Sequence, residues 1–468
     1  MNVKTSIKLI LIFTITLNLL YFSLLTSNSK SNIINYDQLT LINNNLKTSQ
    51  ITNKILINGT SDWIDFRNAG NCTGSGTYSD PYVIEDLIID GGGSGSCIHI
   101  ENSSVFFRIE NCTLFNSGDY SYLIIDAGIS LNNVSNGIIK KNHLMYNLAG
   151  IVISGSNSTI SQNIIDNNLG GIVSDGENIL IYNNSVSNND YGIMAMLGCT
   201  ILENDINYNM VGISCYENVT VSSNNVSFNK MYGIRIVFGN HISIADNYIS
   251  NNNGTAILSS ASYSEIVRNE INNNKEDGIH LKGSIFYGYY SITSPCHDNL
   301  ISQNSINNNF CGIRLNITQD TDVTNNSISN NQICGIDVNS STRIDISTNE
   351  INKNYYGIRM IESAACDILQ NTINHNHYGV YLNSSIGIDI LQNTLHHNRI
   401  CYFETDDCIG NSYQDNDCIE TKNRGLDYLL PLILGIISLS SALGLAIFLY
   451  ARLKSKQNVQ KKSLNYSK

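Results

Sequence analysis

The most regular feature of this chain is an alternation of hydrophobic and polar positions that repeats along most of its length. Twelve copies of Asn-x-[Ile/Leu/Val]-x-x-Asn each lead, two or three residues later, to Gly-Ile-x and usually another apolar residue. The copies follow one another at 20 to 23 residues, apart from one interval of 35. Self-similarity at a fixed period of this length is typical of solenoids, in which each repeat packs only on its neighbours.

Both Asn positions of the repeat are filled in every copy. The second Asn lies five residues after the first, from Asn147 to Asn398, and an aliphatic residue stands between them. Equivalent Asn side chains in stacked coils would lie about 4.8 Å apart, so each amide can donate to one neighbour and accept from the other. We therefore predict two asparagine ladders. The first ladder contains Asn142, Asn163, Asn184, Asn204, Asn224, Asn247, Asn269, Asn304, Asn326, Asn349, Asn371 and Asn393.

The pattern inside each copy is that of short strands. In the Gly-Ile-Arg-Leu segment that begins at Gly312, the two aliphatic side chains point to one side and Arg314 to the other. No helical period separates these segments, so we predict an all-β, right-handed parallel β-helix, a solenoid of about 12 to 14 coils of about 22 residues. The Gly position, replaced only by Ala256 and Cys401, is expected to supply a backbone angle that other residues resist. A leucine-rich repeat would need a Leu-dominated frame.

Two apolar segments near the ends of the chain predict contact with a membrane. Residues 1–27 have the charged start and apolar middle of a signal peptide or N-terminal anchor. Residues 428–450 carry no charge and are long enough to cross a bilayer as a transmembrane helix. The basic tail, 451–468, is then cytoplasmic by the positive-inside rule. We expect a single-pass protein of the cell membrane with its repeats outside the cell.

The ends of a solenoid need caps, because an uncovered coil is an exposed sheet edge. We assign residues 28–80 to an N-terminal cap, 81–410 to the repeats, and 411–427 to a C-terminal cap and juxtamembrane link.

Composition narrows the functional classes. An apolar content of 42% argues against disorder. The net charge of -12 argues against a nucleic-acid partner, because such proteins need a basic face.

Twelve cysteines in an exported chain predict disulfides. Cys311 and Cys334 lie one coil apart, close enough to bond, and Cys401, Cys408 and Cys418 would staple the cap. Alternatively, several of these residues are small buried core residues.

Candidate chemistry must lie on the outside of the rod. The outward residue of each Gly-Ile-x strand forms a column, in which two arginines flank an aspartate before Tyr and Phe. Arg forks bind carboxylates or sulfates at two points, and Tyr rings suit sugars. The alternative is an exposed ladder in which the aspartate only offsets its arginine neighbours. The column is Val152, Val173, Met194, Ser214, Arg235, Leu258, His280, Arg314, Asp337, Arg359, Tyr381 and Phe403, of which Arg235, His280, Arg314, Asp337, Arg359 and Tyr381 are our candidate ligand residues.

The interval of 35 residues inserts a loop beside this column. It carries Tyr287, Tyr289 and Tyr290, which complete the candidate ligand residues, since loops on rigid scaffolds often hold binding groups. The alternative is that these rings only cover neighbouring coils.

Metal and catalytic signals are weaker. His375 and His397 occupy one repeat position in successive coils, with His377 nearby, and stacked imidazoles can share copper or zinc. No Cys-x-x-Cys frame supports such a site, so no cofactor is predicted, and calcium or copper remain open. Glycoside hydrolysis needs two exposed acids about 5 to 9 Å apart, and Asp337 alone is a poor calcium cage.

A family resemblance rests on these repeats together with Trp63-Ile-Asp-Phe and the stretch from Gly74 to Gly91. Over roughly residues 57–410 the chain resembles the right-handed parallel β-helix proteins of the NosD and pectate-lyase-like group, and many such chains resemble archaeal surface proteins with a C-terminal membrane anchor. The resemblance implies a fold far more than an activity, because the group includes carbohydrate-binding modules, polysaccharide lyases and hydrolases, and NosD accessory proteins that help to mature a copper enzyme.

We therefore expect a membrane-anchored surface protein that binds a polysaccharide or surface glycoconjugate without turning it over. A surface polysaccharide lyase or hydrolase is the alternative. Metal delivery of the NosD type is the third hypothesis.

Overall fold

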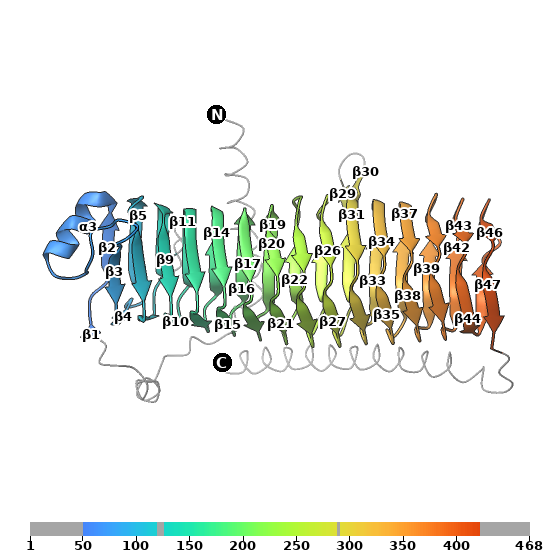
Figure 1. Ribbon diagram of the computed structural model, residues 1–468, viewed down its shortest axis with the longest axis horizontal. Coiled ribbons are helices and arrows are strands. Elements are labelled where there is room, and N and C mark those ends of the chain that lie inside the picture. Colours follow the sequence, from blue (N-terminus) through green and yellow to red (C-terminus); the bar gives the residue numbers. More distant parts are fainter. Residues whose placement is uncertain (1–49, 119–125, 288–290, 422–468) are drawn as a thin grey trace, which may run out of the picture.

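The protein is a rod of stacked β-coils in the computed structural model, which describes residues 50–118, 126–287 and 291–421 (Figure 1). Neighbouring coils pair in parallel along the whole rod, for example β12 with β15 and β36 with β39. Three strands per coil build three sheets, so the predicted parallel β-helix is confirmed.

The strands of each sheet follow one another along the rod axis. The first sheet contains 16 strands within the described residues, β1 (Gln50–Ile51), β4 (Leu87–Asp90), β7 (Thr113–Phe115), β10 (His143–Met145), β12 (Ile164–Asp166), β15 (Ser185–Ser187), β18 (Asp205–Asn207), β21 (Asn225–Ser227), β24 (Tyr248–Ser250), β27 (Glu270–Asn272), β32 (Ser305–Asn307), β35 (Ser327–Ser329), β38 (Glu350–Asn352), β41 (Thr372–Asn374), β44 (Thr394–Asn398) and β47 (Asp417–Glu420). The second contains β2 (Ile55–Asn58), β5 (Ile98–Ser103), β8 (Ala127–Ser135), the first part of β11 (Ala149–Ser161), β13 (Gly170–Ser174), β16 (Tyr191–Leu197), β19 (Val211–Glu217), β22 (Tyr232–Ile236), β25 (Ile257–Ser259), β28 (Ile279–Lys282), β33 (Cys311–Asn316), β36 (Cys334–Asn339), β39 (Tyr356–Ile361), β42 (Tyr378–Asn383) and β45 (Ile400–Glu404). The third contains β3 (Tyr82–Glu85), β6 (Phe107–Glu110), β9 (Gly137–Lys140), the second part of β11, β14 (Glu177–Tyr182), β17 (Cys199–Leu202), β20 (Thr220–Ser222), β23 (Ser243–Ala245), β26 (Glu265–Val267), β31 (Cys296–Ser302), β34 (Thr318–Thr324), β37 (Thr342–Ser347), β40 (Asp367–Leu369), β43 (Asp389–Leu391) and β46 (Ser412–Gln414).

The rod is longer than the 12 to 14 coils predicted. Coils upstream of the first complete repeat also join the sheets, although they lack the paired Asn positions. At the other end, β46 and β47 extend the ladder past 410, where we expected the repeats to end.

The inward aliphatic residues of all three sheets form one continuous core. Ile165, Ile206 and Ile313 are each fully buried. Because every coil contributes the same kind of side chain at the same place, apolar burial extends without a break along the axis.

Both predicted asparagine ladders are present. Asn209 represents the pattern: its Oδ1 accepts from the backbone N and the Nδ2 of Asn189, at 2.9 and 3.0 Å, and its Nδ2 donates to Asn229 Oδ1 at 3.2 Å. The same Nδ2 lies 3.0 Å from the carbonyl oxygen of Val186. The ladders therefore satisfy backbone groups at the turns as well as each other, and Asn416 extends the first ladder by one coil.

The reason predicted for the repeated glycine was wrong. Gly335 does not have a positive φ. A Cβ atom there would instead lie 2.5 Å from Ile351 Cγ2 and 2.6 Å from the carbonyl oxygen of Gly357. Steric contact with the next coil, rather than the backbone angle, therefore excludes larger residues at the repeated glycine. Left-handed backbone angles occur instead at turn residues such as Asn188, with φ 57°.

A helix and a disulfide lie at the two ends of the rod. Helix α3 (Gly59–Asn68) covers the first coils (Figure 1). Its Trp63 is fully buried, donates from Nε1 to Ser103 Oγ at 3.0 Å, and stacks on Tyr82. Near the other end, Cys401 and Cys418 form a disulfide.

The predicted membrane segments, residues 1–27 and 428–450, lie outside the described residues, as does the basic tail, 451–468. Within the part of the chain that the structure describes, no helix combines the length and apolar character needed to span a membrane.

Candidate functional site

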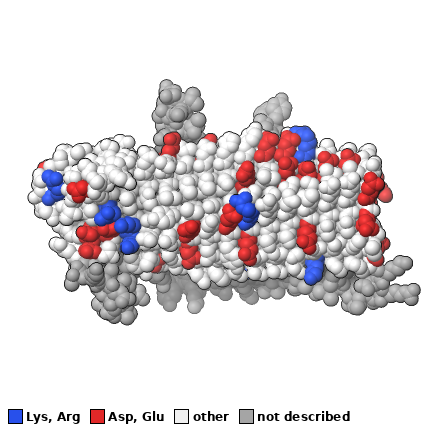
Figure 2. Space-filling model, in the orientation of Figure 1, with Lys and Arg blue, Asp and Glu red and all other residues white. Residues whose placement is uncertain are grey.

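Charged side chains form small, separate groups on the long face of the rod seen in Figure 2, with uncharged surface between them. This face therefore offers local groups of charged side chains rather than one broad charged patch.

The predicted outer column is in register throughout. His280 pairs with Arg314, Arg314 with Asp337, Asp337 with Arg359, and Arg359 with Tyr381. A second column runs beside it on the same sheet, where Cys311, Cys334, Tyr356 and Tyr378 follow one another in successive coils.

Four residues of these coils form an alternating chain of charges, which we call the Arg–Asp ladder: Asp277, Arg314, Asp337 and Arg359. Arg314 contacts Asp277 Oδ2 through Nη1 at 2.9 Å and Asp337 Oδ2 through Nε at 3.2 Å. Arg359 holds Asp337 at two points, with Nε and Nη2 each 2.8 Å from a carboxylate oxygen. The side chains of Asp277 and Asp337 are 4% and 5% exposed, and those of Arg314 and Arg359 are 22% and 24% exposed.

This geometry occupies the guanidinium forks that a bound anion would need. Both oxygens of Asp337 accept from arginine, and the hydrogen bond to Asp337 raises the pKa of Arg359 further. Two acids and two arginines leave the ladder without net charge, and pairs this deeply buried are costly to break.

Sequence reasoning missed Asp277, although a signal was present. It directly precedes a repeat glycine, Gly278, as Cys311 and Cys334 precede theirs, and so belongs to the second column. Its Oδ2 also lies 3.3 Å from His280 Nδ1, which brings the candidate His280 into the ladder.

The remaining column candidate, Arg235, lies apart from this group. Leu258 separates it from His280, and its guanidinium lies 5.8 Å from the ring of Tyr232.

An aromatic cluster follows the ladder toward the C-terminal end. Tyr356 stacks on Tyr378 at 5.3 Å, and Tyr381 on Phe403 at 5.2 Å, with the two stacks edge to face. Arg359 lies 5.3 Å from the centre of the Tyr356 ring. Because the rings stack on each other, they present mainly edges and hydroxyl groups. The cluster consists of Tyr355, Tyr356, His377, Tyr378, Tyr381 and Phe403.

The predicted loop is a hairpin that projects from the rod between β28 and β31 (Figure 1). Strands β29 (Ser284–Tyr287) and β30 (Ser291–Ser294) pair antiparallel. Tyr289 and Tyr290 lie outside the described residues, and the Tyr287 side chain is not described either.

The histidine candidates do not gather into a three-ligand group. His375 and His397 stack at 4.9 Å, whereas His377 stacks on Tyr355 at 4.6 Å. Among the described residues, the groups that bring three metal-ligating side chains together contain no histidine.

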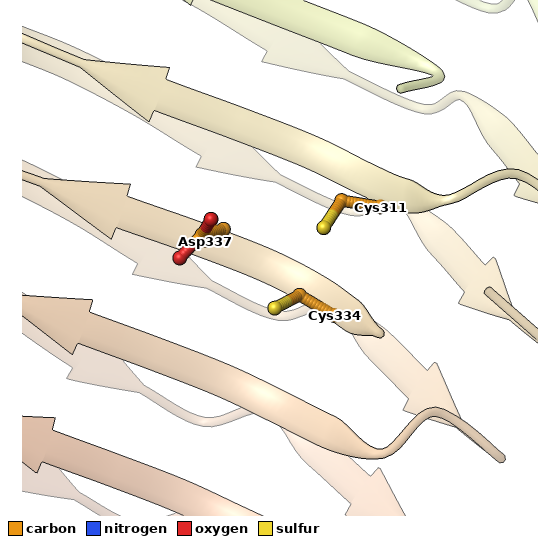
Figure 3. Close-up of side chains that lie close together, drawn as sticks. All are labelled: Cys311, Cys334 and Asp337. Carbon is orange, nitrogen blue, oxygen red and sulfur yellow. The ribbon is translucent and has the colours of Figure 1, made fainter. Parts of the chain in front are cut away.

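Two cysteines of the second column lie side by side. The ligand atoms of Cys311, Cys334 and Asp337 all lie within 4.8 Å of one another (Figure 3). Both sulfur atoms are present as thiols rather than as a disulfide, and the fifth disulfide candidate, Cys408, is also a free thiol.

A column of four aspartates on the third sheet also escaped sequence reasoning. Asp322, Asp345, Asp367 and Asp389 pair in successive coils. Each precedes a ladder Asn by four residues, an offset that could have revealed them. Burial is the main cause that raises the pKa of Asp322, and the charge of Asp345 adds to it. Burial also raises the pKa of Asp367, with smaller contributions from the charges of Asp389 and Asp345.

Replacing Asp345 with Asn should stabilise the protein by about 0.5 to 1 kcal/mol at pH 7. The change removes the charge repulsion between residue 345 and the neighbouring carboxylates of Asp322 and Asp367. The raised pKa values of Asp322 and Asp367 mean that the folded state binds protons more tightly than the unfolded state. The charged aspartates therefore destabilise the fold above these pKa values, and this penalty shrinks as the pH falls toward 3.8, the ordinary pKa of an aspartate. Urea unfolding of Asp345→Asn should show a gain that shrinks on acidification. Asp406→Asn, on an exposed residue, is the control, and equal gains in both variants would contradict the argument.

Comparisons with known proteins agree with this architecture. The model of the family described as "Right handed beta helix region" matches residues 25–218 and 198–349, and that of "Periplasmic copper-binding protein (NosD)" matches 284–429. No curated protein matches.

The chain also resembles solved structures, at low sequence identity and low TM-score. The periplasmic alginate epimerase AlgG is 15% identical, with a TM-score of 0.41, over 79% of this chain and 85% of that one. The A-module of mannuronan C-5 epimerase AlgE6 from Azotobacter vinelandii is 11% identical, with a TM-score of 0.37, over 81% and 98%. The enzymatically active domain of tailspike protein 2 from bacteriophage CBA120 is 12% identical, with a TM-score of 0.39, over 65% and 47%.

The two matches to the β-helix model together span more than half of the chain, and the parallel coils of the structure agree with them. The chain belongs to the right-handed β-helix family.

Proposed function

We propose that this protein is a membrane-anchored surface rod that binds a polysaccharide or surface glycoconjugate through the aromatic cluster, without cleaving it. The anchor would be residues 428–450, with the rod outside the cell and the basic tail in the cytoplasm.

The observation that carries the proposal is the aromatic cluster itself. Five aromatic rings and an imidazole gather on one outer face of successive coils. Phe403 is 41% exposed, and Tyr355, Tyr356 and Tyr381 are partly exposed. Tyrosines combine an apolar body with a hydroxyl group, which suits a ligand that is itself part apolar and part hydroxylated. A linear polymer lying along the axis would meet aromatic side chains in the successive strands β39, β42 and β45, about 4.8 Å apart.

The column arginines are poor targets for testing this proposal. Arg314 and Arg359 hold Asp337, so replacing them would disturb the scaffold together with any ligand contact. The stacked pair Tyr381 and Phe403 holds no buried carboxylate, and Phe403 is 41% exposed, so this pair is the better target.

The double variant Tyr381→Ala, Phe403→Ala should lose at least about tenfold in affinity for a polysaccharide that the parent binds, which corresponds to 1.4 kcal/mol. An array of neutral and acidic polysaccharides against the full-length protein would identify the ligand. Tyr208→Ala, Phe228→Ala removes a similar exposed stack, with centroids 5.3 Å apart, elsewhere on the rod and should bind normally. Unchanged binding by the first variant would refute the assignment of the aromatic cluster.

The aspartate column supports a second candidate function, a polysaccharide lyase or hydrolase. Carboxylates one and two coils apart fall near the separations of about 5 to 9 Å that glycoside hydrolysis requires, and raised pKa values suit a general acid. The same array should therefore be scored for newly formed reducing or unsaturated ends. Cleavage that Asp345→Asn and Asp367→Asn abolish would establish this candidate, and binding without cleavage would exclude it for the sugars tested.

A further inference from the structure

Two buried thiols lie on the outer side of the second sheet rather than in the core. Cys311 and Cys334 occupy the same position in the neighbouring strands β33 and β36, and both are fully buried. The six other buried thiols of the described residues belong to the continuous hydrophobic core, whereas these two do not. Arg314, a residue of the outer column, places Nη2 3.2 Å from Cys311 Sγ. A small reagent can therefore reach the pair without unpacking the core.

The two sulfur atoms are placed to bond with each other. Paired residues of neighbouring parallel strands lie about 4.8 Å apart, within the range of about 4.4 to 6.8 Å that disulfides span between Cα atoms. Figure 3 shows both sulfur atoms on the same side of the sheet, and they lie within 4.8 Å of each other. A bond between Cys311 and Cys334 therefore requires side-chain rotation but no slippage of one strand past the other.

The two thiols differ in how readily they ionise. The hydrogen bond from Cys334, helped by the charge of Arg314, lowers the pKa of Cys311 against the opposing effect of burial. Burial raises the pKa of the Cys334 thiol. The thiolate is the form of cysteine that oxidants attack, and a neighbouring thiol can resolve the oxidised product into a disulfide. Cys311 therefore has the properties of the first sulfur to react, and Cys334 those of the resolving thiol.

A neutral product suits this buried position. Arg314 already contacts Asp277 and Asp337, so two carboxylates balance its positive charge. A disulfide carries no charge and needs no further counter-charge where solvent is excluded. Oxidation of the cysteines would therefore leave the ion pairs of the Arg–Asp ladder in place.

We propose that Cys311 and Cys334 are an oxidative modification site, which hydrogen peroxide converts into a disulfide between neighbouring coils. The Cys311 thiolate attacks one peroxide oxygen, and the O–O bond breaks to give a sulfenic acid and hydroxide. The hydroxide takes up the proton that Cys311 released and becomes water. The Cys334 sulfur then attacks the sulfenic sulfur, its proton joins the departing oxygen, and a second water leaves. This modification does not depend on the glycan binding proposed above.

Peptide mapping of the full-length, reduced protein after treatment with hydrogen peroxide tests the site. The treatment should join the peptides of Cys311 and Cys334, at least tenfold faster than it oxidises Cys366, and dithiothreitol should separate them again. Cys366 is the matched control, because it is a buried thiol of the core. Loss of the Cys311 and Cys334 thiols no faster than that of Cys366, or oxidation without a bond between them, would overturn the proposal.

Two variants test the roles of the two sulfur atoms. Cys334→Ser removes the resolving thiol, so peroxide should leave Cys311 as a sulfenic acid that dimedone traps. Cys311→Ser should leave Cys334 unmodified over the same time, because no thiolate remains to react first. Dimedone adducts at Cys334 in Cys311→Ser that form as fast as those at Cys311 in Cys334→Ser would contradict this order of steps.

Discussion

Replacing Asn209 with Asp in the middle of the second ladder should cost more than about 4 kcal/mol at pH 7, because the change buries an unpaired charge. Asn209 is fully buried. Its Nδ2 donates to Val186 O, Asn207 O and Asn229 Oδ1. A carboxylate would place a negative oxygen against these three acceptors and donate nothing to them.

Urea unfolding would measure this loss, and hydrogen exchange would locate it in the coils around residue 209, since a solenoid can open locally. Burial should raise the pKa of the new carboxyl group in the folded state above its unfolded value. The folded variant then gains protons first as the pH falls, so its deficit should shrink on acidification. Asn188→Asp, at an exposed turn one residue before the ladder, should change stability by less than about 0.5 kcal/mol. Comparable losses of stability in the two variants would show that disruption of the asparagine ladder is not the cause of the loss in Asn209→Asp.

Replacing Asp337 with Ala should cost about 3 to 5 kcal/mol, the usual penalty when one partner of a buried ion pair is removed. Arg314 and Arg359 both lose the carboxylate that they share. The two guanidinium groups are then left facing each other across one coil.

Asp320→Ala is the matched control, because it removes the acid of an exposed pair in which Arg343 is 55% exposed. Its cost should stay below about 1 kcal/mol. Replacing all four residues of the Arg–Asp ladder with apolar side chains of similar size should restore most of the stability lost in Asp337→Ala. Chemical denaturation measures both losses. A loss of stability in Asp337→Ala no greater than in Asp320→Ala would refute the claim that the buried ion pairs of the Arg–Asp ladder stabilise the fold.

The repeat made most of the fold predictable. The spacing of the Asn and Ile positions fixed both ladders and the register of the outer column, because parallel coils place equivalent residues side by side. Residues 82–115 join the sheets without that spacing, so the number of coils was underestimated.

The candidate site was predictable in position but not in geometry. The sequence places Arg314 and Arg359 one coil on either side of Asp337. Whether their guanidinium groups face solvent or the Asp337 carboxylate depends on the burial and orientation of the side chains, which the spacing does not determine. Mutual stacking of the rings likewise depends on side-chain orientation. The aspartate column, by contrast, could have been found from its constant offset to the first ladder.

Both ladders have a direction. Each ladder Asn that is followed by another in the next coil toward the C-terminal end donates to it from Nδ2, as Asn189 does to Asn209 and Asn209 to Asn229. The N-terminal coils lack the paired Asn positions, so neither ladder reaches that end of the rod, and a second rod could add there only by pairing with the edge strands. Helix α3, fixed by the buried Trp63, covers the coils that carry these edges.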